Sequence, residues 1–111
     1  MAIRDEYGYT SVSVNIGDWD MDASTLVNFT HGLSATEWKT LRISSVTIRN
    51  DLDNQYSPLD AFDGTSLNGG ILFISSSTIR LTRLTGGTYD NTSFDSTSYN
   101  RGWITYKYIA D

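Results

Sequence analysis

The sequence contains no cysteine, a single proline, a single histidine and only two lysines, Lys39 and Lys107, in 111 residues. Without cysteine the chain can form neither disulfides nor thiolate metal sites. Eight bases against 13 acids give a net charge of −5. Because affinity for phosphates depends on clustered lysine and arginine, we expect neither nucleic acid nor an anionic membrane as a partner. The sequence shows no apolar run long enough to span a membrane and no apolar secretion signal at its start.

Residues that favour helices are scarce as well. Of the 13 acids, 11 are aspartate, which prefers turns to helix interiors, and serine and threonine supply 28 residues. Aromatic residues, in contrast, make up 13% of the chain. The length fits one small domain, whose thin core could be reinforced by self-association. The composition therefore predicts a globular, turn-rich β-protein.

Hydrophobic residues alternate along several segments with the period of two that is typical of strands. Val12, Val14 and Ile16 share one face of the first such segment. Similar segments at 26–30, 41–50, 71–75, 76–85 and 101–110 bring the expected total to six or seven strands. The fold class predicted is all-β, an antiparallel β-sandwich or a jelly-roll-like barrel. Residues 9–111 should form a single sandwich domain, preceded by a polar N-terminal arm at 1–8.

Three local signals refine this prediction. Ser34 and Glu37 have the spacing of a capping box, which predicts one short helical turn near 34–38. The inward parity switches between Ile43 and Val46, which predicts a β-bulge or bend at Ser44-Ser45. Residues 51–70 hold the proline and many turn formers, and we expect them to be the longest loop.

The last segment, at 101–110, carries apolar or aromatic groups on both faces. Such a strand is either central in a sandwich or covered by a partner subunit. Arg83 shares the parity of Ile79 and Leu81, which puts a guanidinium on an inward face. Either that face meets another subunit or the register slips at a bulge. We therefore predict an oligomer interface at Arg83, Trp103, Tyr106 and Tyr108.

No motif in the sequence indicates catalysis or a cofactor. Asp18, Asp20 and Asp22 alternate like the start of a calcium loop, but the glycine and glutamate that an EF-hand requires later are missing. A second acidic loop holds Asp51, Asp53, Asp60 and Asp63, which we interpret first as solvated turns. His31 stands alone at a strand end, without a nucleophile elbow. We predict no enzyme, no metal and no cofactor; a small glycan-degrading enzyme acting through the second acidic loop is the least favoured alternative.

Aromatic and acidic residues also occur together on loops, as they do in sugar sites of lectin-like sandwiches. The candidate glycan-binding residues are Tyr56 with Asp53 and Asp60, and Tyr89 with Asp90 and Asn91. Packing of the two tyrosines against the domain is the competing interpretation.

Four segments carry a resemblance to a known group of proteins: 15–24 (NIGDWDMDAS), 46–60 (VTIRNDLDNQYSPLD), 81–90 (LTRLTGGTYD) and 96–111 (STSYNRGWITYKYIAD). In these the chain resembles small virion proteins and fibre-tip domains of tailed bacteriophages, crAss-like phages among them. The resemblance implies a non-enzymatic, self-assembling β-sandwich on the outer surface of a capsid or tail. Because no shaft precedes the domain, a head-fibre or capsid-decoration subunit is favoured over a tail-fibre tip.

The resemblance also implies partners. The first is the chain itself, as a homotrimer or, second, a dimer; the others are further virion proteins, to which the arm at 1–8 would dock.

The alternative function is a glycan-binding adhesin resembling H-type lectins, which would bind a host surface glycan during attachment.

Overall fold

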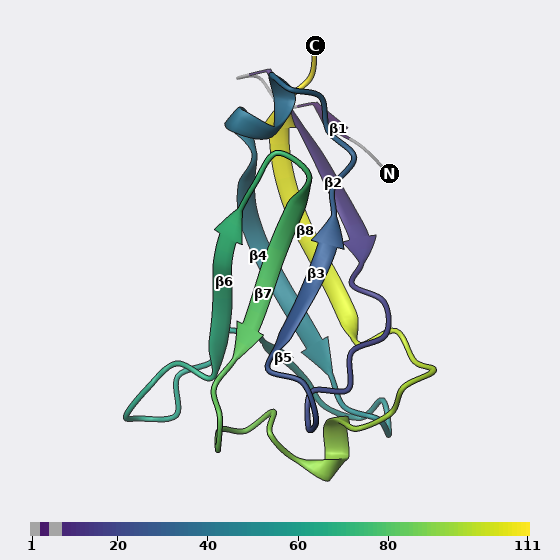
Figure 1. Cartoon of the computed structure of the whole chain (residues 1–111), viewed down its shortest axis with the longest axis vertical. Helices are drawn as coiled ribbons and strands as arrows, with labels where there is room; N and C mark the ends of the chain where they lie inside the picture. Colours follow the sequence, from purple (N-terminus) through teal and green to yellow (C-terminus); the bar gives the residue numbers. More distant parts are fainter. Residues whose placement is uncertain (1–2, 5–7) are drawn as a thin grey trace.

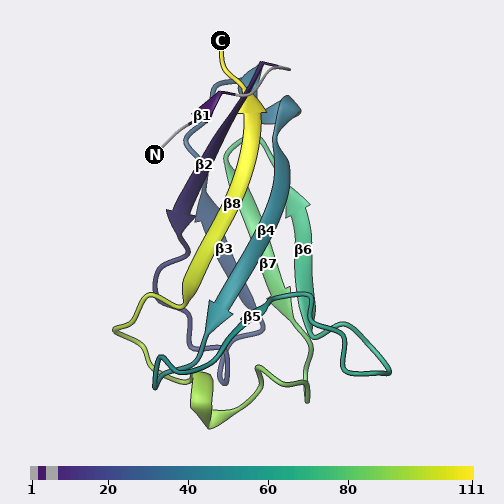
Figure 2. The same cartoon turned by 180° about the vertical axis from the view of Figure 1, so that it is seen from behind.

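The computed structural model describes residues 3–4 and 8–111. Its strands are β1 (Ile3–Arg4), β2 (Tyr9–Asn15), β3 (Leu26–Thr30), β4 (Arg42–Arg49), β5 (Tyr56–Pro58), β6 (Gly69–Ile74), β7 (Thr78–Arg83) and β8 (Gly102–Ile109), with 3₁₀ turns η1 (Glu37–Thr40) and η2 (Thr92–Phe94). Two antiparallel sheets face each other, one with strand order β1-β2-β8-β4-β5 (the large sheet) and one with order β3-β7-β6 (the small sheet) (Figures 1 and 2). The prediction of an all-β antiparallel sandwich is confirmed.

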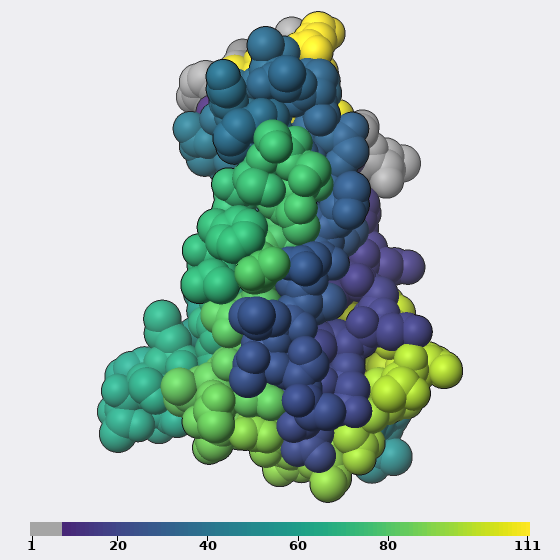
Figure 3. Space-filling view, viewed as in Figure 1, coloured from purple at the N-terminus to yellow at the C-terminus, as the bar shows by residue number. Residues whose placement is uncertain are grey.

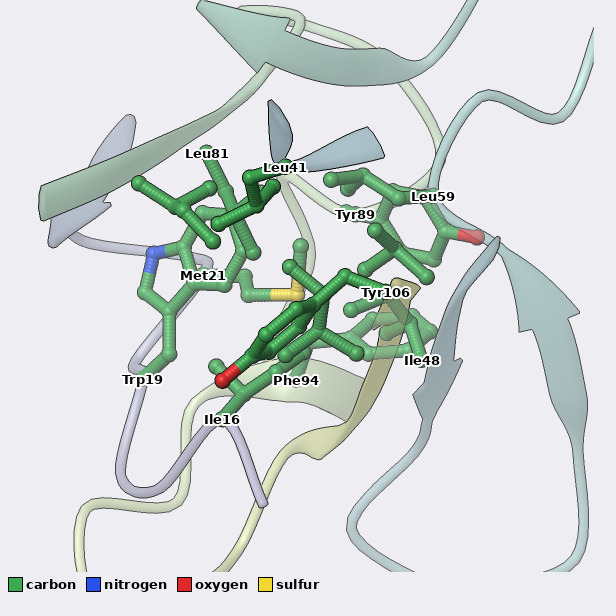
Figure 4. Close-up of a cluster of buried hydrophobic side chains, with 13 residues drawn as sticks. Ile16, Trp19, Met21, Leu41, Ile48, Leu59, Leu81, Tyr89, Phe94 and Tyr106 are labelled. Atoms are coloured by element: carbon green, nitrogen blue, oxygen red, sulfur yellow. The ribbon is translucent and has the colours of Figure 1, made fainter. Parts of the chain in front are cut away.

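The core lies between the two sheets and continues into the loops at one end. Ile79 and Leu81 of β7 are fully buried opposite Ile48 and Ile104 of the large sheet. At the loop end, Trp19 from the segment after β2 joins them; it is 3% exposed, and its indole N–H donates to the carbonyl of Ser24 at 3.0 Å. Figure 4 shows this ring beside Met21 and Leu81. An acidic, turn-rich loop is thus anchored by its apolar side chains.

The closing strand β8 is central in the large sheet, which is one of the two places predicted for it. It pairs with β2 along its full length and with β4 on its other side. Ile104 and Tyr106 point into the core, whereas Trp103, Thr105 and Lys107 lie on the outer face. The outer face of its neighbour β2 carries Ser11, Ser13 and Asn15 in register with them.

Two local predictions are confirmed. The register between β4 and β8 shifts between Ile43 and Ser45, so that a bulge lies where the inward parity switches. In the capping box, the N–H of Glu37 donates to the Ser34 hydroxyl at 3.2 Å, and the N–H of Ser34 donates to the Glu37 carboxylate at 3.0 Å. The 3₁₀ turn itself occupies Glu37–Thr40, a few residues later than expected.

Two strands were missed. β5 lies inside the segment predicted as the longest loop, because a three-residue strand that ends in proline shows no periodicity. β1 lies in the predicted arm, at Ile3–Arg4, and pairs antiparallel with Ser11 and Thr10 of β2. The rest of the arm, apart from Gly8, lies outside the described residues. In the described part of the chain, no helix is long and apolar enough to cross a membrane.

Candidate functional site

The outer face of the large sheet carries a stack of side chains at its loop end. Arg49 ends β4, Tyr56 begins β5, Trp103 lies at the start of β8, and Tyr99 precedes β8. The register brings them together, since Thr47 pairs with both Trp103 and Pro58, and Arg49 pairs with Tyr56. We call these four side chains, with Asp53, the aromatic ladder.

The members of the ladder contact one another in sequence. The rings of Tyr56 and Trp103 stack with centroids 5.7 Å apart and an interplanar angle of 13°. The Arg49 guanidinium lies 5.2 Å from the Trp103 centroid and 4.1 Å from that of Tyr99, at cation–π distances. Its Nε donates to the Asn100 carbonyl at 2.8 Å. The ladder therefore has a fixed geometry although it lies at the surface.

Asp53 ties the ladder together at its exposed end. It accepts hydrogen bonds from the Tyr56 hydroxyl and, at 3.2 Å, from Arg49 Nη1. The hydrogen bond from Tyr56, followed by the contact with Arg49, lowers the pKa of the Asp53 carboxyl, and the same bond raises the pKa of Tyr56. Asp53 reaches this position with φ of 54°, the left-handed region that aspartate tolerates better than most residues.

The other predicted glycan residues do not join the ladder. Tyr89 is 1% exposed and stacks edge-on against Phe94 in the core, so the prediction that its ring binds a sugar is wrong. Burial raises the pKa of its hydroxyl, which donates to the Pro58 carbonyl at 2.6 Å. Asn91 caps η2 by accepting from the N–H of Ser93. Asp90 lies beside Arg83, and the exposed Asp60 lines a groove between β4 and β6.

The predicted interface residues also divide. Arg83 does point inward, but it is 5% exposed and its guanidinium meets its own chain: Nε donates to the Met21 carbonyl, Nη2 donates to the Asp22 carbonyl, and Nη1 lies 3.4 Å from the Asp90 carboxylate. Tyr106 is 4% exposed and faces the core. Neither is available to a partner, which corrects the prediction for both. Trp103 belongs to the ladder, and the half-buried Tyr108 packs against the core beside Tyr106.

Arg101 was missed, although it is the most buried charged side chain among the described residues, with 0% exposure. Its Nε donates to the Trp19 carbonyl at 3.0 Å, its Nη1 to the Arg49 carbonyl at 2.9 Å and its Nη2 to the Asp51 carboxylate at 2.8 Å. It thus joins the segment after β2, the end of β4 and the loop before β8. These contacts, which we call the Arg101 clamp, hold in place the backbone on which the aromatic ladder stands.

Asp51 completes this arrangement. Although burial alone would raise its pKa, the Arg101 guanidinium and the Ser96 N–H hold the pKa of the carboxyl below its usual value of 3.8. The neighbouring Asp95 behaves in the opposite way, because its contact with Asp51 raises its pKa. Within the described part of the chain, no three histidine, aspartate or glutamate side chains converge in a way that could hold a metal ion.

Acidification should destabilise the folded chain through Asp51. A carboxyl whose pKa is lowered by folding contributes stability that is fully present above the unfolded value, here 3.8, and is lost as the pH falls through the folded value. Urea unfolding of Asp51→Asn between pH 5 and pH 2 should therefore show a smaller loss of stability than the unaltered chain, and the loss that remains should come from other carboxyls whose pKa is lowered by folding, such as Asp53 and Asp63.

Asp95→Asn is the matched control for this titration. The raised pKa of Asp95 opposes the contribution of Asp51 over the same range, so removing Asp95 should leave the loss of stability as large or larger. Equal losses in Asp51→Asn and the unaltered chain would contradict the role given to Asp51.

A second surface feature lies on the small sheet, around its edge strand β6. Six of the exposed large apolar side chains lie in or next to this strand: Phe62, Leu67, Ile71, Leu72, Phe73 and Leu84, which together we call the β6 patch. A shallow hollow of about 320 Å³ is lined by Leu67, Ile71, Leu72 and Leu84. Figure 3 shows the loop between β5 and β6 standing out from the body beside this strand.

The β6 patch borders a groove between the two sheets. Because β5 pairs only with Thr47–Arg49, the first half of β4 has an uncovered edge on this side. The groove, of about 390 Å³, lies between Ile43–Val46 of β4 and Gly70-Ile71 of β6. Two unpaired strand edges therefore open toward the same side of the sandwich.

Comparison of the chain with protein-family models, with curated proteins and with solved structures finds no match in any of the three.

Proposed function

We propose that this chain is a non-enzymatic structural subunit of a tailed-bacteriophage particle, of the head-fibre or capsid-decoration type, which assembles with copies of itself on the outer surface of the particle. The resemblance of its sequence segments to virion proteins supports the particle, and the sandwich fold is compatible with it. The observation that carries self-assembly is the β6 patch.

The size of the patch fits a subunit interface. Its six side chains are between 40% and 65% exposed and together present on the order of several hundred Å² of apolar surface, as the larger apolar patches of protein surfaces do. A stable interface buries about 800 Å² per partner, of which roughly 60% is apolar. The patch therefore supplies about the apolar area that one such interface needs.

The backbone of β6 adds directional contacts. In the small sheet β6 pairs with β7 on one side only, so N–H and C=O groups of its outer edge are open to another strand. The outer face of β2 and β8 presents mainly serine, threonine, asparagine and lysine, which suit water. We therefore propose that copies of the chain meet at the β6 patch, as a homotrimer first and a dimer second. Antiparallel pairing of two β6 edges would give the dimer.

The positions of the carboxylates support a non-enzymatic role. Asp51 binds the buried Arg101, Asp90 lies beside the buried Arg83, and Asp53 accepts from Tyr56 and Arg49. Asp63 accepts from the N–H groups of Thr65 and Ser66 within its own turn. Each of these carboxylates holds local structure.

Light scattering of the purified chain tests the assembly. We expect a mass of two or three times 12.4 kDa, and Leu72→Asp should shift the population to the single chain, because it places a charge within the apolar β6 patch. The affinity of the variant for itself should fall at least tenfold.

Leu52→Asp is the matched control. Leu52 is 79% exposed but lies outside the patch, so the same substitution there should leave the mass unchanged. If the chain stayed monomeric up to about 1 mM, any self-association would be very weak. That result would overturn self-assembly.

Immunogold labelling tests the location. An antibody against the purified chain should label the outside of intact phage particles that encode it, at a regular copy number. If the antibody did not label such particles while the purified chain still assembled in solution, the virion role would be rejected, but the interface at the β6 patch would not.

A further inference from the structure

We propose that the aromatic ladder is a binding site for a neutral saccharide, with Tyr56 as its stacking platform. The site does not depend on self-assembly, since the ladder lies on the outer face of the large sheet and the β6 patch belongs to the small sheet. It gives the adhesin alternative a defined location.

The first argument is a pre-positioned aromatic face. Tyr56 is 52% exposed, yet its ring is held by the stack on Trp103 and its hydroxyl by Asp53. The exposed part of the Tyr56 ring adds little to the stability of the fold, because it is not removed from water. A ring that is already ordered loses little side-chain entropy when a ligand stacks on it. The C–H face of a pyranose is the complementary surface.

The second argument is the polar rim. The Asp53 side chain remains 51% exposed beside the ring, and its carboxylate can accept hydrogen bonds from sugar hydroxyls. Asn15 is exposed on β2 directly opposite Trp103 in register. Asn54 is exposed next to Asp53; its Oδ1 accepts from Asn50 Nδ2 at 2.7 Å, so its Nδ2 is the group it can offer to a ligand. The rim therefore offers carboxylate and amide groups on two sides of a stacked aromatic pair, the combination that a molecule rich in hydroxyls requires.

The third argument is charge, which decides between ligand classes. Arg49, the cation of the ladder, already pairs with Asp53 at 3.2 Å, and the chain has a net charge of −5. A phosphate, a nucleic acid or an acidic polysaccharide would meet no uncompensated positive charge here, and all would be repelled by the chain as a whole. A neutral saccharide carries no charge, so neither the Arg49–Asp53 pair nor the net charge of the chain opposes its binding.

The experiment is binding of the purified full chain to a printed array of neutral hexose and N-acetylhexosamine oligosaccharides, followed by titration of the best one with tryptophan fluorescence as the signal. We expect saturable binding that changes the emission of Trp103. Tyr56→Ala should weaken binding at least tenfold, because it removes the platform. Tyr56→Phe keeps the ring and should stay within about threefold of the unaltered chain.

Leu52→Ala is the matched control. It removes an apolar side chain that is 79% exposed in the loop that also holds Asp53, and it should not change binding. Thermal unfolding of Tyr56→Ala should be close to that of the unaltered chain, which separates loss of the platform from loss of the fold. Binding that survives Tyr56→Ala, binding only to acidic saccharides, or no binding to any neutral saccharide on the array would each overturn the proposal. Light scattering of the same variants reports assembly separately.

Discussion

Replacement of Arg101 by methionine is expected to lower the free energy of unfolding by about 3–5 kcal/mol. Methionine fills much of the volume but donates no hydrogen bond. The carbonyls of Trp19, Arg49 and Ser96 would lose the guanidinium that now binds them, and the Asp51 carboxylate would lose its counter-ion. Each buried polar group left without a partner costs about 1–3 kcal/mol. Urea unfolding at neutral pH measures the change.

Arg42→Met is the matched control. Arg42 is exposed, and among the described residues its side chain donates to the nearby carbonyls of Lys39 and Leu41, so its loss should cost less than about 0.5 kcal/mol. Arg101→Lys should lie between the two, since an ammonium is a single donor centre that cannot reach all of these acceptors at once. If Arg101→Met cost no more than Arg42→Met, the clamp would have no energetic meaning.

Hydrogen exchange should locate the damage. Arg101 joins three segments that are far apart in the sequence, so its loss should speed exchange in the segment around Trp19 and in residues 95–100. The paired strands β2 and β8 near Tyr9 and Ile109 lie at the other end of the sandwich, and their amides should keep their protection from exchange (Figure 2). The ladder residues Arg49 and Tyr99 are neighbours of the clamp, so the same variant should also weaken saccharide binding.

The features that could be predicted from the sequence are those with a local cause. The alternation in β8, the parity switch at Ser44-Ser45 and the capping box at Ser34 and Glu37 each depend on residues a few positions apart. Such patterns record which face of a strand is buried or how a turn begins. They were sufficient for the sandwich, but they left two places open for β8, of which the structure shows the central one.

The clamp could not be found in this way, because all its partners except Ser96 lie between 50 and 82 positions from Arg101. A guanidinium that meets backbone carbonyls leaves no mark on the sequence of its acceptors, since every residue has a carbonyl. Arg83 shows the same limit. Its inward parity was visible, but its acceptors, the carbonyls of Met21 and Asp22, were not, and so a partner subunit was predicted in their place.

Only part of the aromatic ladder could be predicted from the sequence, for a related reason. Tyr56 and Asp53 are three residues apart, so their proximity could be predicted from the sequence, although Tyr56 begins the strand β5 and does not lie on a loop. Trp103 was assigned to an interface because its stacking on Tyr56 requires β5 to pair with β4, and β5 had no periodic signal. Tyr89 was grouped with the exposed residues because a tyrosine next to aspartate and glycine has the composition of a surface turn.

Gly102→Ala is expected to be at least as damaging as the loss of Arg101. A Cβ built on Gly102 would lie 1.9 Å from the carbonyl oxygen of Thr47 and 3.2 Å from Cα of Ile48. Both are backbone atoms of the adjacent strand β4, so no side chain can turn away to make room, and the two strands would have to separate. Because β8 is central, the separation would disturb the core at Ile48 and Ile104 and the ladder at Trp103. We expect a loss of more than about 4 kcal/mol, or a chain that does not fold.

Gly70→Ala provides the comparison that makes this prediction specific. Gly70 is also a strand glycine, but nothing lies within 4 Å of its Cβ position and its φ is not positive. Alanine there restricts the unfolded chain and should change stability by less than about 1 kcal/mol, in the stabilising direction. Thermal unfolding of both variants at one protein concentration separates the effects, because a shared propensity effect would move both equally. If Gly102→Ala unfolded within a few degrees of Gly70→Ala, the close approach of β8 to β4 would not exist in solution, and the register that builds the ladder would be wrong with it.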